Sequence, residues 1–216
     1  MKLTKRILSI VVIAQLVLAF NLLHAQEYQG YSSAEIARLN TAKSADYLTV
    51  DEKEVVLVLN MIRSNGAKFW DKMAEPYIAK HDEIKPSRYT SSLERDLRNA
   101  PNLPILSPNK TLHKVANKHA VASGREGLLG HKSPAGTFEQ RLKPLTRDFN
   151  YLLENCDYGS SKAMDIIMNL MIDEGIPDVG HRKNILHEQI DAAGIAIAPH
   201  KTYSHTCVQV FGKLRE

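Results

Sequence analysis

Cysteine is scarce in this chain of 216 residues, which contains only Cys156 and Cys207. Two cysteines are too few for a disulfide-framework miniprotein or a four-cysteine zinc module. Common catalytic motifs are missing as well: there is no Gly-x-Ser-x-Gly elbow, no phosphate-binding glycine loop and no context typical of a catalytic cysteine. With 44% apolar and 24% charged residues, the composition is nevertheless that of an ordinary globular protein.

An excess of charge of one sign is also missing from most of the chain. The formal net charge is +4, but Lys2, Lys5 and Arg6 precede any acidic residue, so residues 26–216 carry 25 basic against 24 acidic side chains. Affinity for nucleic acid depends on neutralising many phosphates. The nearly neutral remainder therefore gives no electrostatic argument for a nucleic-acid partner.

The N-terminal segment has the pattern of a secretory signal peptide. A basic stretch precedes an apolar run from Ile7 to Leu23, and Ala25 supplies the small residue before a cleavage site. We therefore expect a signal peptide at residues 1–25 and a mature protein that is secreted or periplasmic. An uncleaved signal anchor is the alternative, although the run is at the short limit for spanning a bilayer. No later run approaches 18 apolar residues, so we expect no membrane span after cleavage.

Hydrophobic periodicity divides the remaining chain into a polar N-terminal arm at 26–48 and one domain at 49–216. We expect the arm to be mobile, with one short helix around residues 34–40. The domain opens with Thr49-x-x-Glu52, a capping box that predicts a helix. Helices are also expected at 69–80, 91–99, 107–122 (with Pro108 in its first turn), 161–173 and 181–186, and strands at 151–156, 193–198 and 206–211. Helices with a few late strands indicate an α+β layered domain.

Short motifs along this domain occur in a recognisable order. Two lie in expected helices: Leu59-Asn60-x-x-Arg63 and Leu112-x-x-x-Ala116-x-x-His119-Ala120. The others are Gly130-His131-x-Ser133-x-x-Gly136, Glu154-Asn155, Gly180-His181-Arg182-Lys183-Asn184, Gly194-Ile195-Ala196 and Val208-Gln209-Val210-Phe211-Gly212. The series resembles the CAP superfamily (cysteine-rich secretory proteins, antigen 5 and pathogenesis-related proteins), in its bacterial branch of SCP-like extracellular proteins. The resemblance covers about residues 50–213.

The resemblance implies a fold and a site. The fold is an α-β-α sandwich around a small central antiparallel sheet, and the site is a cleft with two histidines and two acidic residues. Carried onto this chain, three of the four are His131, Glu154 and His181. The fourth is either Asp173 or Glu174, at the end of the helix that precedes His181.

Two imidazoles and two carboxylates from separate segments have three possible uses. They can bind zinc, they can exchange protons near neutral pH, or they can form a satisfied polar cluster that holds loops to the sheet. The spacing matches no zincin motif such as His-Glu-x-x-His. Some members of the family bind a divalent metal in this cleft, so the resemblance implies a zinc site on His131 and His181. His119, on an apolar helix face, is interpreted instead as a hydrogen-bonded core histidine.

The two cysteines lie in expected strands, and an exported chain meets an oxidising compartment. We therefore expect a Cys156–Cys207 disulfide, with two buried thiols as the alternative.

The function predicted from these features is that of an exported binding module. Its ligand would be a divalent metal, a small lipid or a peptide. A zinc-assisted hydrolase that uses the His/Glu cleft is one alternative, and a structural envelope protein is another. Whether the protein is an enzyme stays open.

Overall fold

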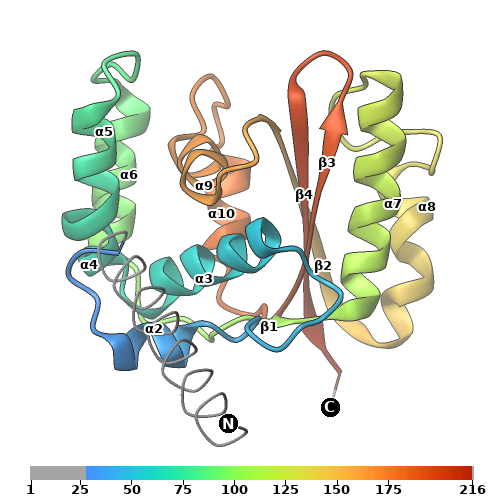
Figure 1. Cartoon of the computed structure of the whole chain (residues 1–216), viewed down its shortest axis with the longest axis horizontal. Helices are drawn as coiled ribbons and strands as arrows, with labels where there is room; N and C mark the ends of the chain where they lie inside the picture. Colours follow the sequence, from blue (N-terminus) through green and yellow to red (C-terminus); the bar gives the residue numbers. More distant parts are fainter. Residues whose placement is uncertain (1–27, 216) are drawn as a thin grey trace, which may run out of the picture.

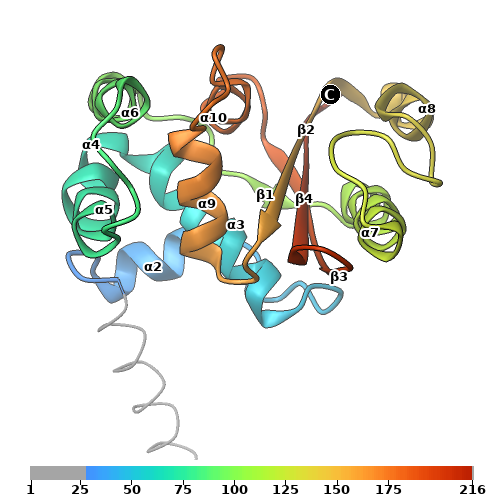
Figure 2. The ribbon, with the colours of Figure 1, turned by 90° about the horizontal axis from the view of Figure 1, so that it is seen from above.

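The computed structural model describes residues 28–215, so the expected signal peptide lies outside the described residues. A four-stranded sheet stands between two layers of helices (Figure 1). Viewed from above, α7 (Lys110–Glu126) and α8 (Phe138–Leu142) cover one face of the sheet, whereas α3 (Val50–Ser64) and α9 (Ala163–Ile172) lie on the other (Figure 2). The expected α+β sandwich is therefore confirmed. Within the described range, no helix is both long and apolar enough to cross a bilayer.

The sheet has the strand order β1-β3-β4-β2, which leaves β2 at one edge. Its strands are β1 (Ser107–Pro108), β2 (Phe149–Gly159), β3 (Ala192–His200) and β4 (Ser204–Leu214). The three long strands pair antiparallel, with Glu154 opposite Val210 and Gly194 opposite the same residue of β4. The short β1 pairs parallel with β3. Pro108 therefore lies in a strand, and not in the first turn of α7 as expected, because Asn109 caps that helix.

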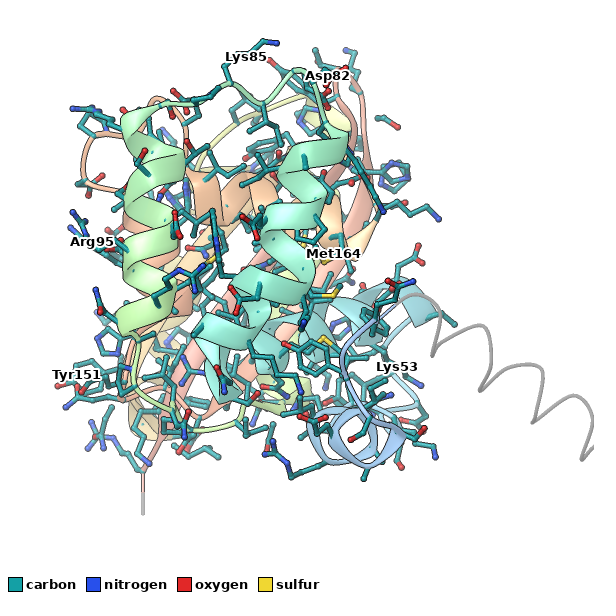
Figure 3. The ribbon with its side chains drawn as sticks, turned by 90° about the vertical axis from the view of Figure 1, so that its left-hand side faces the viewer. Lys53, Asp82, Lys85, Arg95, Tyr151 and Met164 are labelled. Atoms are coloured by element: carbon teal, nitrogen blue, oxygen red, sulfur yellow. The ribbon has the colours of Figure 1, made fainter. Side chains whose placement is uncertain are left out.

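The remaining helices fill the α9 side of the molecule or connect its elements. They are α2 (Ser33–Leu39), α4 (Gly66–Phe69), the π-helical η1 (Trp70–Ala74), α5 (Glu75–Lys80), α6 (Arg88–Asn99), the 3₁₀ segment η2 (Lys143–Arg147) and α10 (Gly180–Ile185). Helices α5 and α6 run side by side, joined at one end by the loop that carries Asp82 and Lys85 (Figure 3). The expected helix at 69–80 is thus three consecutive segments. The wider π turn lies just before Pro76, which has no amide hydrogen to donate to the preceding turn.

Two buried side chains of α3, Asn60 and Arg63, explain the polar residues of the Leu59-Asn60-x-x-Arg63 motif. Asn60 is fully buried and bonds the backbone of Leu106 through both ends of its amide, and its Nδ2 also donates to the carbonyl of Leu39. Arg63, also fully buried, donates to the carbonyls of Pro104, Ile185, His187 and Ile190. A buried guanidinium is tolerated when its donors are satisfied. Burial lowers the pKa of Arg63 to about 10.

Residues 28–48 are packed against the rest of the domain. Tyr28, Leu39 and Ala42 are almost completely buried, and the Tyr28 hydroxyl donates to Glu54 of α3 at 2.6 Å. The expected short helix is present as α2, which begins at a capping box formed by Ser32 and Glu35. The segment that we expected as an arm is thus packed on the domain at residues 28–48, because several of its apolar side chains lie in the core.

Candidate functional site

Edge strand β2 presents consecutive side chains to opposite faces of the sheet, as the pleat requires. Cys156 belongs to the apolar cluster under α7, on the face where Glu154 also lies. Asn155 and Asp157 face the other way, toward α10 and α9. β2 therefore supplies polar side chains to both faces of the sheet, the α7 side and the α9 side.

On the α8 side of β2, a fully buried carboxylate side chain holds an imidazole and a guanidinium. Glu154 Oε1 lies 2.9 Å from His131 Nδ1, and its two oxygens accept from Arg141 at 2.5 and 2.7 Å. Burial alone would raise the pKa of the Glu154 carboxyl, but the hydrogen bonds from His131 and Arg141 hold it below its usual value. Glu154 is therefore ionised near neutral pH. It orients a His131 side chain that is 48% exposed.

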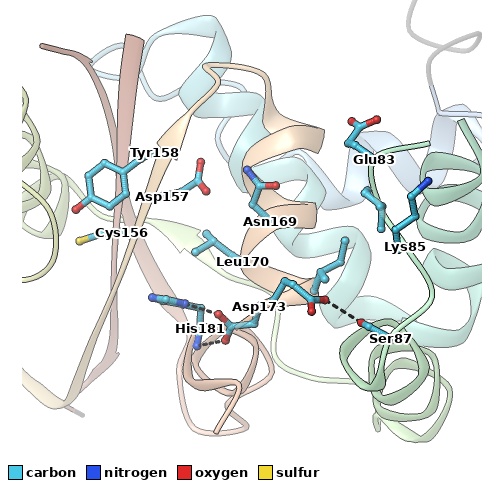
Figure 4. Close-up of a pocket in the computed structure, with 13 residues that line it drawn as sticks. Glu83, Lys85, Ser87, Cys156, Asp157, Tyr158, Asn169, Leu170, Asp173 and His181 are labelled. Carbon is cyan, nitrogen blue, oxygen red and sulfur yellow. Dashed lines mark hydrogen bonds and ion pairs between the residues drawn. The ribbon is translucent and has the colours of Figure 1, made fainter. Parts of the chain in front are cut away.

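On the α9 side, a second carboxylate holds the second imidazole. Asp173 Oδ1 lies 2.7 Å from His181 Nδ1, and its Oδ2 accepts from the His181 backbone amide at 3.0 Å (Figure 4). Glu174 instead accepts a hydrogen bond from the Ser87 hydroxyl. The difference arises from the backbone, because Asp173 has φ 58° and ψ 39°, a left-handed turn that ends α9 and directs this carboxylate back toward α10.

Backbone strain two residues before His181 helps to set its position. Val179 has φ 48°, and a β-branched residue rarely adopts this left-handed conformation. Strain of this kind persists only where the surrounding structure enforces it, and it is concentrated at functional sites. Here Arg182 provides the constraint: it is almost completely buried and donates to the carbonyls of Met171, Ile172 and Tyr89. Arg182 thus anchors α10 in the core.

The two His–carboxylate pairs approach β2 from its two faces. Each Nδ1 is occupied by a carboxylate, and among residues 28–215 neither His131 nor His181 has a hydrogen bond at Nε2. A carboxylate that accepts from Nδ1–H leaves the lone pair on Nε2, the arrangement seen in metal-bound histidines. Each imidazole therefore keeps Nε2 available as a ligand atom, with Glu154 and Asp173 as orienting groups.

A second, buried group also has ligand atoms close together. Those of His119, Glu154 and Cys156 all lie within 4.8 Å of one another, which is close enough to hold a metal ion. These atoms are otherwise engaged, however. His119 bonds Ser133 and Gly130 through its two ring nitrogens, and Arg141 occupies both oxygens of Glu154. Burial raises the pKa of the Cys156 thiol far above its usual value, so it carries no thiolate. His119 is thus a satisfied core histidine, as expected.

The two cysteines are free and buried. Cys156 lies opposite Val208, and Cys207 lies opposite Asp157, so the two are one position out of register. Cys156 packs in the cluster under α7, whereas Cys207 packs in the cluster on the α3 side. The expected disulfide is therefore wrong, because the pleat directs the two thiols to opposite faces of the sheet.

A cavity of about 600 Å³ adjoins the His181–Asp173 pair (Figure 4). Residues 156–158 of β2 form its back wall, α9 and the turn after it form one side, and the loop at 83–87 forms the other. His131 and Glu154 do not line it. A cavity of this size is typical of small-molecule sites.

Sequence reasoning missed Asp157, which lines this cavity and is 6% exposed. Its Oδ2 atom is shielded and has no hydrogen-bond partner among the described residues. Burial raises the pKa of Asp157 to about 7. The available signal was an aspartate directly after the strand expected at 151–156.

Comparison with known families identifies the family of this domain. Residues 95–211 match the sequence profile of the family described as "CAP: Cysteine-rich secretory protein family". A search of curated proteins found no match.

Several solved structures are similar. An extracellular protein of Bacillus anthracis with an SCP domain is 25% identical with a TM-score of 0.43, and the match covers 58% of this chain but only 38% of that one. An outer surface protein of Borrelia burgdorferi is 22% identical with a TM-score of 0.45, covering 61% of this chain and 97% of that one. Venom allergen-like protein 4 of Schistosoma mansoni is 12% identical with a TM-score of 0.41, covering 78% and 92%. Because the family profile matches more than half of the length of this chain, the chain belongs to the CAP family of cysteine-rich secretory proteins.

Proposed function

We propose that this protein is an exported binding module whose His131 and His181 imidazoles hold a divalent metal ion, with zinc as the best fit. The observation that carries the proposal is that each Nδ1 is held by a buried carboxylate, at 2.9 Å in one pair and 2.7 Å in the other. Zinc accepts imidazole nitrogen readily, and partners on the second ring nitrogen fix the tautomer and raise the basicity of the ligand.

The roles of the residues follow from this arrangement. Glu154 and Asp173 accept from Nδ1–H, which fixes the orientation of each ring and leaves its Nε2 as the atom that would bind the metal. Arg141 keeps Glu154 ionised and in place. Bound zinc would supply a Lewis acid that polarises an oxygen of a ligand. The adjoining cavity gives the module a place for a small lipid or peptide beside His181.

Zinc titration of the protein after chelator treatment tests the proposal. We expect the His131→Ala and His181→Ala variants each to lose zinc affinity by about 100-fold or more, and Asp173→Asn to lose about 10- to 100-fold through misorientation of His181. His205→Ala is the matched control, since the His205 ring is bonded to the neighbouring Ser204 and belongs to neither His–carboxylate pair. Zinc affinity that is unchanged in both alanine variants would refute the proposal, provided that circular dichroism shows them to be folded.

Export is the second part of the proposal. It is supported by the basic and apolar pattern of residues 1–25 and the small residue at Ala25. Intact mass of the protein recovered from the periplasm or medium tests it. We expect a chain that begins at Gln26, and a mass that includes Met1 would contradict cleavage.

A further inference from the structure

The cavity beside His181 is lined by both acidic and apolar side chains. Ile84, Leu170 and Ile172 are among its lining residues. Its carboxylates come from three separate elements: Glu83 from the loop after α5, Asp157 from β2, and Asp173 and Glu174 from the turn after α9. The basic side chains of the lining are Lys85 and His181.

Two of these carboxylates already have partners. Asp173 is bonded by His181, and Glu174 accepts from Ser87. Asp157 differs from them because its Oδ2, in a side chain that is 94% buried, has no hydrogen-bond partner within residues 28–215. A buried carboxylate oxygen without a partner is costly, and natural structures compensate it with a proton, a water or a cation. Figure 4 shows the Asp157 side chain in the space between β2 and Asn169 of α9.

We propose that this cavity binds a small organic cation, a protonated amine on an apolar body, with the Asp157 carboxylate as its counter-ion. The inference rests on the proposed function, because it names a ligand class for that binding module. The ammonium group supplies both the N–H donor and the positive charge that the inner end of the cavity lacks. The apolar body packs against Leu170, Ile172 and Ile84.

The shape of the site favours an organic cation over a bare metal ion. Asp157 is not part of the one close group of His, Cys, Asp and Glu ligand atoms found in the described residues. A metal ion at Asp157 would thus have one carboxylate, whereas hard cations take six or more oxygen ligands. A cavity of about 600 Å³ is also far larger than a single water needs.

Three probes of similar shape test the inference: phenethylamine, the neutral 2-phenylethanol and the anionic phenylacetate. Titration calorimetry at about pH 8, where Asp157 is mostly ionised, is run with EDTA so that no metal contributes. We expect phenethylamine to bind with a dissociation constant of about 1 mM or below, and the other two to bind at least about tenfold more weakly.

The Asp157→Asn variant keeps the shape of the side chain and removes its charge. We expect it to bind phenethylamine about tenfold more weakly or worse, while its affinity for 2-phenylethanol is unchanged. Asp148→Asn is the matched control, because Asp148 is an exposed aspartate that does not line the cavity. Thermal unfolding of each variant establishes that it is folded.

The possible failures are distinguishable. If the amine and the alcohol bind equally well, the cavity is a ligand site without charge selection, and the inference is overturned while the proposed binding module stands. Absence of binding by all three probes, or an unchanged amine affinity in Asp157→Asn, also overturns it. Loss of zinc binding alone has no bearing on the cation site, since EDTA is present throughout.

Discussion

At the scale of single residues, Asp157 makes the stability of the fold depend on pH. Burial raises the pKa of Asp157 from 3.8 to about 7; a hydrogen bond from Asn169 opposes this effect and the charge of Asp165 of α9 adds to it. Its other ionisable neighbours include Cys156 of β2, Cys207 of β4 and Tyr77 of α5. The folded state therefore holds a proton that the unfolded state releases between about pH 4 and 7. Stability contributed by this residue is present below the unfolded pKa and is lost as pH rises through the folded one.

We therefore expect Asp157→Asn to flatten the fall in stability between about pH 4 and 8. The variant should gain about 3 kcal/mol on the wild type between pH 5 and pH 8, because the folded state keeps its proton up to about pH 7 and each pH unit over which only the unfolded state has released it corresponds to about 1.4 kcal/mol. Urea unfolding at pH 5 and 8 measures the difference. Parallel loss of stability in both proteins would show that another group titrates in this range.

Arg141 and Glu154 form a buried ion pair, with side chains that are 2% and 0% exposed. Removing one member leaves a charge with no partner in the core. We expect Arg141→Leu to destabilise the protein by about 3–5 kcal/mol, and Arg141→Leu with Glu154→Leu to recover most of that loss. Chemical denaturation of the two single variants and the double variant gives the coupling energy. A double variant that is no more stable than Arg141→Leu would mean that the pair acts mainly through its hydrogen bonds to the 131–136 loop.

The sequence predicted part of this chemistry at the residue scale. The resemblance identified His131, Glu154 and His181, and the structure pairs the first two. It left Asp173 and Glu174 open, because the choice depends on a left-handed turn at Asp173 that no propensity of aspartate specifies. Asp157 was missed since its burial depends on the packing of α9 and the 83–87 loop against β2, contacts that are distant in sequence.

At the scale of elements, close approach of α7 to β3 depends on Gly194. A Cβ atom built there would overlap the backbone of Leu112 and His113. We expect Gly194→Ala to destabilise the protein by more than about 3 kcal/mol, because backbone cannot move aside as a side chain can. Gly180→Ala is the control, since a Cβ there meets only the Asp178 side chain at 3.4 Å or more. Thermal unfolding compares the two, and equal melting temperatures would contradict the steric argument.

Elements with strong local signals were predicted well. The Thr49 capping box is present. The Glu52 amide nitrogen lies 3.2 Å from the Thr49 hydroxyl oxygen, and the Glu52 carboxylate lies 2.8 Å from the Thr49 amide nitrogen. Helix α9 and strands β2, β3 and β4 lie where periodicity placed them, although their ends differ. Pro108 was misassigned because the parallel pairing of β1 with β3 is a tertiary contact. The cysteine prediction failed for a similar reason, since the register of β2 on β4 decides which face each thiol occupies.

At the scale of the whole molecule, the segment at 28–48 is part of the core. Composition predicted an arm because the segment is polar on average, but several of its apolar residues, including Leu39, Ala42 and Leu48, are buried. The Leu39 carbonyl also accepts from buried Asn60 of α3. The segment therefore covers apolar surface of the first long helix, α3, and also provides a hydrogen-bond acceptor for its buried Asn60.

We accordingly expect a chain that begins at Thr49 to be much less stable than one that begins at Tyr28. Loss of residues 28–48 exposes the face of α3 that packs under α2. It also removes the Leu39 carbonyl that accepts from Asn60, and both the exposed apolar surface and the lost hydrogen bond lower stability. We expect the shorter chain to unfold at a lower urea concentration by an amount equivalent to more than about 3 kcal/mol, or to aggregate. The chain from Tyr28 serves as the reference, and a variant of it with Leu39→Ala separates apolar packing from the Asn60 hydrogen bond. Equal urea midpoints for the two chains would show that the domain is complete from residue 49 onward.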